Sequence, residues 1–432
     1  MTETAKTSSD ESGGGVPRRR RRRWLWGSAL AVAVLVAGAA VAGWVAYVKL
    51  DGNITPDEAA ARELARYERQ RPAALVRGAQ NILLIGSDSR SGDGNARYGR
   101  DLGTERSDTT ILLHLSAGRR TATAVSVPRD LMVDVPDCRR RDGSRTEPAF
   151  AMFNHAFQAG GSACTIRTVE KLTGIRVDHH VVVDFHGFKE MVDAVSGVEV
   201  CLSRPVRDKA ARLRLPAGRV TLDGEQALGW VRARKSLGDG SDTDRMDRQQ
   251  RFLGALVNKV QSNDVLLNPV KLYPVLDAAT SSLTTDPALA NLRGLYELVR
   301  SLRDIPTEQV QFLTVPRRSY VYNANRDQLV EPEAEKLFER LRRDEPLAVT
   351  KEVPRESTVK SGNAPGGGPE NSGNQENSFG DMGEHAYERP YDYGEYGDGN
   401  AKPADRRPDG PSSTVSPGPT FRGNTAAEDT CG

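Results

Sequence analysis

The sequence NILLIGSDSR at residues 81–90 joins a run of apolar residues to a short polar segment. The same pattern recurs in RSDTTILLHL at 106–115 and in AVSVPRDL at 124–131. Short runs rich in β-branched and other apolar residues, bounded by polar loops, are typical of strands. We therefore expect three consecutive strands here, and the polar segments lie where each strand begins or ends.

Strands and helices alternate through the rest of the chain, and this mixture predicts an α/β domain. The expected strands are Ile82–Ile85, Thr110–Leu115, Thr121–Val127, His180–Phe185, Val198–Leu202 and Val310–Val315. Apolar residues at helical spacing predict helices at Phe188–Val195, Ser241–Val260 and Leu289–Leu302.

The first three strands have a chemical consequence if they form an antiparallel meander. The end of the first, the start of the second and the end of the third then share one edge of the sheet, which brings Asp88, Asp108 and Arg129 together. Two carboxylates suit a hard cation such as Mg²⁺ or Mn²⁺, and an arginine suits a phosphate. The alternative is that these are ordinary solvated turn residues.

The stretch VRARKSLGDGSDTDRMDRQQR at 231–251 adds a second basic cluster. Arg232 and Arg234 face the same side if this segment is extended. A helix is expected to begin near Asp242, and its apolar stripe places Arg245 and Gln249 on the inward face, where a helix N-terminus favours anions. The alternative, a charged helix face with intrahelical ion pairs, accounts for Arg248 and Arg251.

The N-terminal region predicts a membrane anchor. Residues 24–48 carry no charge and are long enough to span a bilayer, with Trp and Tyr at both ends. Six arginines, Arg18–Arg23, precede this segment and predict a cytoplasmic N-terminus, 1–23, with the rest of the chain outside the cell membrane. A cleaved signal peptide is the alternative, but its apolar core is shorter. A nucleic-acid ligand for the arginines does not fit this location.

The domain organisation follows from composition. Residues 49–80 are charged and helix-forming, which predicts a stalk or linker, and the globular domain is expected at 81–347 with its core at 81–260. Residues 348–432 are rich in Gly, Pro, Ser, Asn and acidic residues, so we expect a disordered tail. Net charge is +2, so anion binding depends on local clusters.

Cysteine placement indicates a disulfide rather than a zinc site. The chain contains no CxxC pair, and Cys138 and Cys164 flank a polar segment, so we expect them to pair in an exported domain. The sequence also lacks a GxSxG elbow, an HExxH motif and a P-loop.

The ordered set of motifs resembles the LytR-CpsA-Psr family of cell-wall glycopolymer transferases, of actinobacterial type. The resemblance covers residues 81–260 and, more weakly, extends to 347. It implies a mixed central sheet flanked by helices, with an apolar tunnel for a polyprenyl chain. The motifs that carry it are NILLIGSDSR, RSDTTILLHL, AVSVPRDLMVDVP, FNHAFQAGG, VDFHGFKEMVDAVSGVEV, LDGEQALGWVRAR and DRMDRQQRFL.

The resemblance implies transfer of a glycopolymer from polyprenyl pyrophosphate to peptidoglycan through a phosphodiester. It implies that Asp88 and Asp108 bind the metal and that Asp242 lies near the head group. Asp242, or Asp130, is a candidate general base. One departure is Met152, where members often carry a lysine. The implied pyrophosphate ligands are Arg90, Arg129, Arg232, Arg234, Arg245 and Gln249, of which Arg129, Arg232 and Arg234 are, with Asp242, the implied catalytic residues.

Three other functions remain open at this point, one of which is a regulator that acts on nucleic acid through Arg18–Arg23. The predicted site at the sheet edge could instead hydrolyse a lipid pyrophosphate with water as acceptor, or it could sense envelope intermediates without turnover. The sequence does not distinguish these from a transferase, and it does not identify the glycopolymer.

Overall fold

A computed structural model describes residues 18–87, 107–140, 142–209, 211–233, 242–261, 269–350 and 420–428, with only the backbone given for 18–25, 242 and 269–271. The described residues belong to one compact unit, formed by 1–353 and 419–432; the second unit, 354–418, lies outside them. Among the sequence-predicted residues, Asp88, Arg90 and Arg234 also lie outside the described ranges.

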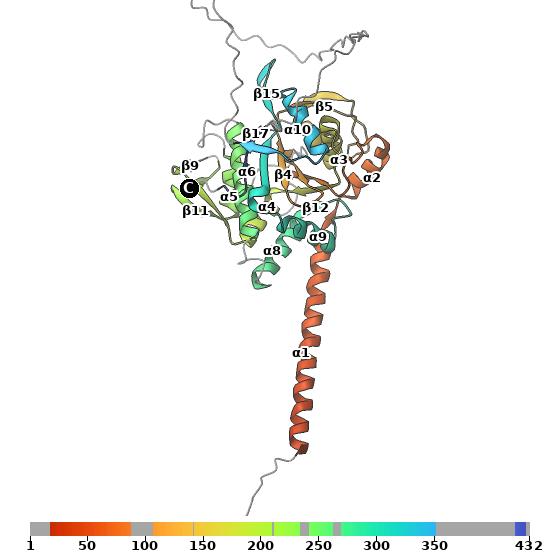
Figure 1. Ribbon diagram of the computed structural model, residues 1–432, viewed down its shortest axis with the longest axis vertical. Helices are drawn as coiled ribbons and strands as arrows, with labels where there is room; N and C mark the ends of the chain where they lie inside the picture. Colours follow the sequence, from red (N-terminus) through yellow and green to blue (C-terminus); the bar gives the residue numbers. More distant parts are fainter. Residues whose placement is uncertain are drawn as a thin grey trace, which may run out of the picture. The chain divides into compact units, whose positions relative to one another are not determined.

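A nine-stranded mixed sheet forms the centre of the unit (Figure 1). Its order is β1-β12-β7-β2-β3-β4-β13-β17-β16. The predicted meander is present, because β3 pairs antiparallel with both β2 and β4. In sequence order the strands are β1 (Thr55–Pro56), β2 (Gln80–Ser87), β3 (Ser107–Leu115), β4 (Ala122–Val127), β7 (His179–Val183), β12 (Leu283–Thr285), β13 (Val310–Thr314), β16 (Ala348–Thr350) and β17 (Thr420–Thr425).

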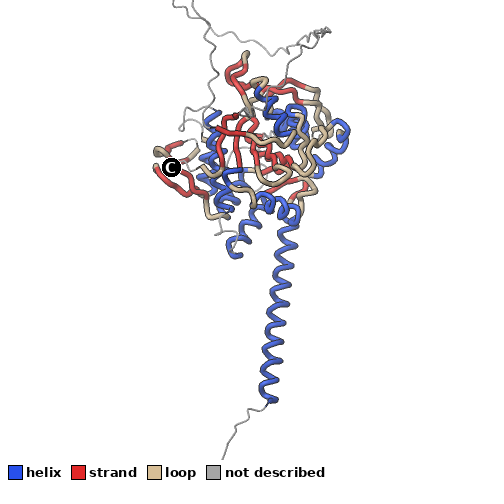
Figure 2. The backbone as a smooth tube through the Cα atoms, in the orientation of Figure 1, coloured by secondary structure: helices blue, strands red, loops and turns tan. Residues whose placement is uncertain are grey.

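Helices cover both faces of this sheet, as Figure 2 shows by colour, so its central strands are apolar on both sides. In β2, Leu83 and Ile85 join one core, and Ile82 joins the core on the other face. The first core is closed by α2 (Glu58–Arg66), α3 (Asn154–Thr173) and α10 (Glu333–Arg342), and the second by α6 (Asp242–Gln261) and α9 (Leu292–Arg303). The expected fold, a mixed central sheet flanked by helices, is confirmed.

A third core forms where α6 packs against a small layer beside the main sheet. Phe252 of α6 is buried there with Trp230. The predicted strand Val198–Leu202 is present, but it belongs to this layer and pairs with β11 rather than with the main sheet. The layer contains α4 (Phe185–Ala194), α5 (Gly224–Arg232), β8 (Val198–Leu202), β9 (Val206–Asp208), β10 (Leu213–Leu215) and β11 (Gly218–Leu222), with α8 (Pro269–Ser282) packed on α4.

In the described structure, two antiparallel strand pairs and two 3-10 helices lie outside the main sheet and the small layer. One pair is β5 (Met132–Val135) with β6 (Ala149–Met152), and the other is the hairpin of β14 (Arg317–Tyr320) with β15 (Asn323–Leu329). The 3-10 helices are η1 (Glu68–Gln70) and η3 (Thr307–Gln309).

The N-terminal helix α1 (Arg18–Asn53) contains one segment, Trp26–Asn53, that is long and apolar enough to cross a membrane. This agrees with a single membrane anchor. The helix continues past residue 48, and its last turns contact the domain: the backbone N–H of Leu292 donates to Asp51 at 2.8 Å.

The prediction of a stalk at 49–80 is wrong for these residues, because most of the segment packs on the domain. β1 pairs with β12, and Leu64 of α2 is buried in the first core. Arg71 forms a two-point ion pair with the buried Glu170, with Nη2 to Oε1 at 2.7 Å. The sequence pattern of α2 reads as an exposed helix because only one narrow stripe of it is apolar.

The prediction of a disordered tail at 348–432 is wrong for two short segments. β16 and β17 are parallel neighbours, and β17 also pairs antiparallel with β13. Phe421 is buried in the first core, and the side chain of Asn258 in α6 donates to the carbonyl of Ala426 at 2.6 Å. A strand of six residues in a Gly- and Pro-rich sequence carries too little apolar pattern to be recognised.

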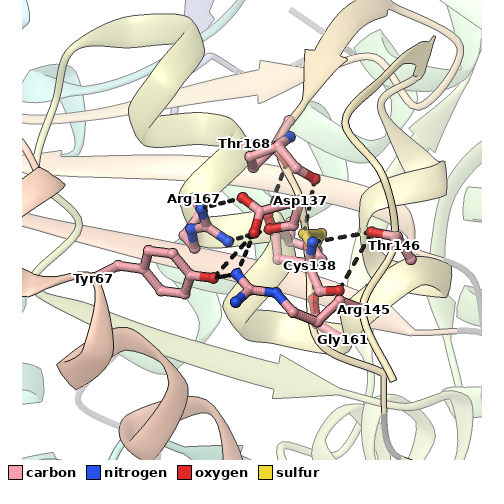
Figure 3. Close-up of a disulfide and its surroundings, with 11 residues drawn as sticks. Tyr67, Asp137, Cys138, Arg145, Thr146, Gly161, Arg167 and Thr168 are labelled. Carbon is pink, nitrogen blue, oxygen red and sulfur yellow. Dashed lines mark hydrogen bonds and ion pairs between the residues drawn. A yellow bond between two sulfur atoms is a disulfide. The ribbon is translucent and has the colours of Figure 1, made fainter. Parts of the chain in front are cut away.

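The expected disulfide between Cys138 and Cys164 is confirmed, and it ties the segment after β5 to α3 (Figure 3). The ring of Tyr67 lies under the guanidinium of Arg167, 3.5 Å from the ring centroid, and Arg167 pairs with Asp137. Cys201 is also disulfide-bonded, and Cys431, the remaining cysteine of the sequence, lies outside the described residues.

Candidate active site

The candidate site lies at the edge of the main sheet where β2, β4, β7 and β13 end and β3 begins. Asp108 is the second residue of β3, and Arg129 follows β4. Their side chains meet, with Arg129 Nη1 2.8 Å from Asp108 Oδ1. The meander therefore brings together two of the three residues that the sequence predicted at this edge, while Asp88 lies outside the described residues.

Arg129 is held by a second carboxylate and by the backbone. Its Nε donates to Asp130 Oδ2 at 3.3 Å, and its carbonyl accepts from the N–H of Asn154 at 3.0 Å. Asn154 begins α3 in the FNHAF motif, so the motif supports the position of Arg129 from the backbone side. Arg129, Asp108 and Asp130 are each about a quarter exposed, which leaves the group open to a ligand while it stays fixed.

The first turn of α6 is joined to this edge through residues that the sequence analysis missed. Arg317, at the start of β14, donates to Asp327 Oδ1 and to Thr243 Oγ1, both at 2.5 Å. The N–H of Asp327 donates to the carbonyl of Asp130 at 3.0 Å. Hairpin β14–β15 thus connects the Arg129 segment to the N-terminus of α6. The hairpin lies far along the chain from every recognised motif, so only the fold reveals this contact.

α6 also fixes the end of α5. Gln249 donates from Nε2 to the carbonyl of Val231 at 3.3 Å, and Arg248 donates to the carbonyl of Ala233. Arg245 is buried, as the inward face predicts. Arg248 is buried too and donates to the carbonyl of Ala233, so a charged helix face with intrahelical ion pairs does not account for it.

Arg232 is the last residue of α5 rather than part of an extended segment, so that prediction is wrong. The capped helix from Asp223 runs on to Arg232 because GEQALGWVR is a good amphipathic helix. The Arg232 guanidinium carbon lies 4.4 Å from the ring centroid of Phe185, which begins α4 directly after β7. This cation–π contact presents Arg232 at the same sheet edge. Asp242 is the first residue of α6, and the structure describes only its backbone.

A cavity of about 810 Å³ adjoins this edge. Ser87 at the end of β2 and Asp184 after β7 line it from the sheet. The lining is mixed in charge, with acidic side chains such as Asp57, Glu63 and Asp184 beside basic side chains from α2 and from the segment after β5. The basic side chains are Arg62, Arg66, Arg139 and Arg140.

The donor set partly fits the predicted metal. Arg129 uses Oδ1 of Asp108, so within the described contacts Oδ2 remains able to bind a hard cation such as Mg²⁺. The described residues contain no group of three or more His, Cys, Asp or Glu that could hold an ion on their own. A metal here would therefore need Asp88 and waters beside Asp108.

Comparison with known proteins identifies the fold and the family. The chain is 40% identical over 212 residues to "Probable cell wall biosynthesis protein LcpB" of Corynebacterium glutamicum, covering 47% of each chain, so it spans about half the length of that relative. It is 28% identical over 330 residues to "Polyisoprenyl-teichoic acid--peptidoglycan teichoic acid transferase TagT" of Bacillus subtilis, covering 74% of this chain and 95% of that one.

A solved structure of a Streptococcus agalactiae protein shares the fold, with a TM-score of 0.51 at 19% identity over 62% of this chain and 87% of that one. The sequence pattern of one family matches residues 50–343, which begins at the end of α1 and includes the segment predicted as a stalk. That family is the LytR-CpsA-Psr family, and this chain belongs to it.

Proposed function

We propose that this protein is a membrane-anchored phosphotransferase that moves a glycopolymer from polyprenyl pyrophosphate to peptidoglycan and leaves a phosphodiester link. The observation that carries the proposal is the convergence of Arg129, Asp108 and the first turn of α6 at one open sheet edge. The printed name of the Bacillus subtilis relative, a teichoic acid transferase to peptidoglycan, supports it.

The proposed step is an in-line phosphoryl transfer. A sugar hydroxyl of the acceptor attacks the glycan-side phosphorus, the bridging P–O bond breaks, and polyprenyl phosphate leaves with both bonding electrons. Arg129, Arg232 and Arg245, with Arg90, Arg234 and Gln249, stabilise the charge that develops on the pyrophosphate. Asp130 or Asp242 takes the hydroxyl proton. A bound Mg²⁺ or Mn²⁺, held by Asp88 and Asp108, would neutralise phosphate charge.

The proposed location follows from the anchor. The protein lies in the cell membrane with a single span, the basic N-terminus in the cytoplasm and the catalytic domain outside, where the carrier lipid and peptidoglycan meet. Protease added to intact spheroplasts should remove the domain and leave the N-terminal residues protected. Digestion of the N-terminus instead would reverse the orientation.

The deciding experiment follows polyprenyl phosphate release by the full-length chain in nanodiscs from a polyprenyl pyrophosphate-linked sugar. Transfer requires that the sugar appears on added peptidoglycan fragments. We expect Arg129→Ala to lower the rate about 100-fold or more, because an arginine facing developing charge contributes on that scale. Arg293→Ala, an exposed arginine on α9, is the matched control and should keep full activity.

The outcomes separate the rival functions. Release without joining would indicate a hydrolase, and binding without release would indicate a sensor of lipid-linked intermediates. Loss of activity on chelation, restored by Mg²⁺, would support the metal, whereas equal rates with a chelator would remove it from the mechanism.

A further inference from the structure

Three aromatic rings, two exposed and the middle one half-buried, form a row on hairpin β14–β15 and strand β6. The ring centroids of Phe150 and Tyr320 are 6.1 Å apart, and those of Tyr320 and Tyr322 are 5.4 Å apart. Tyr322 is 79% exposed and Phe150 50% exposed. We call these three residues the aromatic row. Large side chains gathered in solvent usually mark a place of contact with a ligand or partner.

The row is fixed to the candidate active site. Its hairpin contains Arg317 and Asp327, whose contacts join it to α6 and to the carbonyl of Asp130. Arg326 of the same hairpin lies 3.9 Å from Asp130 Oδ1. A molecule resting on the row is therefore held at a defined position beside Arg129 and Asp130.

The chemistry of the surface suits a sugar chain. The face of an aromatic ring carries partial negative charge and attracts the polarised C–H groups on the flat side of a sugar ring. The exposed amides of Asn323 and Asn325 and the exposed guanidinium of Arg318 surround the row and offer hydrogen bonds to hydroxyl and acetamido groups. A protein partner would need a wider apolar patch than one hairpin tip offers.

The position of the row argues against a lipid surface as its ligand. The anchor α1 leads into β1 at one edge of the main sheet, whereas β14 follows β13, six strand positions away in the sheet order. Six strand spacings amount to roughly 29 Å. Figure 1 shows β15 projecting from the side of the domain away from α1.

We propose that the aromatic row binds the glycan strand of the acceptor and presents its hydroxyl group to the phosphorus at the Arg129 edge. This inference rests on the proposed transferase function and adds the acceptor-binding surface to it. The row binds neighbouring sugars of the strand and takes no part in the bond-breaking step, so Tyr320 and Tyr322 are positioning residues for the acceptor.

The test uses full-length protein in nanodiscs and soluble glycan strands of alternating N-acetylglucosamine and N-acetylmuramic acid without peptide stems. The double variant Tyr320→Ala/Tyr322→Ala should raise the acceptor Kd and KM about tenfold or more, the scale expected for two stacked rings. The Kd for the polyprenyl pyrophosphate-linked sugar should stay at the wild-type value, because the row contacts the acceptor and not the donor. Tyr322→Phe should keep acceptor affinity, since the ring face remains.

Tyr296→Ala provides the matched control, because Tyr296 is also exposed but lies on α9, a helix that contacts the anchor α1. Unchanged acceptor KM in the double variant would overturn the inference while leaving the transferase intact. A wild-type protein that releases polyprenyl phosphate but never joins sugar to glycan would instead refute the proposed function. If the double variant converted a dimer to a monomer in sedimentation, the row would be a self-interface and the inference would fall.

Discussion

Two adjacent glutamines in α6 show how much one residue step changes a side chain's role. Gln249 is half-buried and contacts the end of α5, whereas Gln250 is buried. Gln250 Nε2 donates to Ser126 Oγ at 3.1 Å and to Thr314 Oγ1 at 3.0 Å, which joins the ends of β4 and β13. The family resemblance implies a ligand role for Gln249 and none for Gln250. Only the packed helix shows that Gln250 is the one that contacts the sheet.

The two glutamines therefore predict opposite mutational effects. Gln250→Ala should destabilise the domain by about 2 kcal/mol, because the buried Ser126 hydroxyl and the half-buried Thr314 hydroxyl lose a partner and a cavity opens. Gln249→Ala should leave the free energy of unfolding nearly unchanged and lower transfer activity. Chemical denaturation and the release assay, run on both variants, check this; equal stability losses would contradict the assignment.

Asp57 predicts how stability changes at low pH. Burial opposes its ionisation, but hydrogen bonds with His180, Ser162 and the N–H of Ala60 outweigh this and lower its pKa to about 2 from 3.8. The unfolded chain therefore binds the proton more readily, so this contribution is complete above pH 4 and is lost as pH falls from about 4 to 2. The shift corresponds to about 2 kcal/mol.

Asp57→Asn should remove the pH-dependent contribution that Asp57 makes to the free energy of unfolding. Differential scanning calorimetry between pH 5 and pH 2.5 should show a smaller fall in Tm for the variant than for wild type. An identical fall in Tm for the variant and wild type would show that other titrating groups cause the loss of stability in acid.

At the scale of elements, sequence patterns predicted the structures whose apolar spacing is regular. The meander β2–β3–β4 and helices α4, α6 and α9 were predicted within a few residues. Helix α3 was missed because Gly160 and Gly161 interrupt it, and Gly161 has a φ of +62°. β14–β15 and its Arg317 were missed because hairpin residues such as Asn323 carry no apolar alternation.

The glycine pair lies beside the disulfide for a steric reason. A Cβ at Gly160 would stand 2.9 Å from the Cys164 Cβ and 3.0 Å from the Cys138 Cβ. The two sulfur-bearing segments can approach only because residue 160 has no side chain. The disulfide therefore depends on a glycine at position 160.

Replacing Cys138 and Cys164 by serine should cost about 3 kcal/mol of stability, from the entropy of a cross-link spanning 26 residues. The expected result is a lower Tm for the unreduced variant, and a smaller fall on reduction than wild type shows, because reduction of the variant breaks only the disulfide of Cys201. Cys138→Ser/Cys164→Ser with an unchanged Tm would show that the clamp of Tyr67, Arg167 and Asp137 in Figure 3 holds this segment without the bond.

At the scale of the whole molecule, residues far apart in the sequence complete one domain. β1 lies at one edge of the main sheet and β16 at the other, with β17 next to it. Strands of two to six residues are too short to show a reliable hydrophobic period. The predicted domain range, 81–347, is therefore too short at both ends. Composition predicted a change in character at 348, but it did not predict that residues 420–425 return to the sheet.

Removal of β17 should therefore weaken the domain more than removal of the segment before it. A chain that stops at 353 loses Phe421 from the first core and the contact of Ala426 with Asn258, and its Tm should fall by several degrees. A chain in which a Gly/Ser linker of about a dozen residues replaces 354–418 should melt near wild type. A stable chain ending at 353 would show that β17 is dispensable.

The parallel pairing of β16 with β17 makes residues 351–419 an insertion rather than a tail, because the chain leaves the sheet and re-enters it at the next strand. Each doubling of such a connection costs only about 0.6 kcal/mol of closure entropy. Evolution can therefore lengthen, shorten or replace this segment with little effect on the fold. Protein engineers can do the same: a reporter domain inserted into this segment would leave β17 paired with β13 and β16 in the sheet.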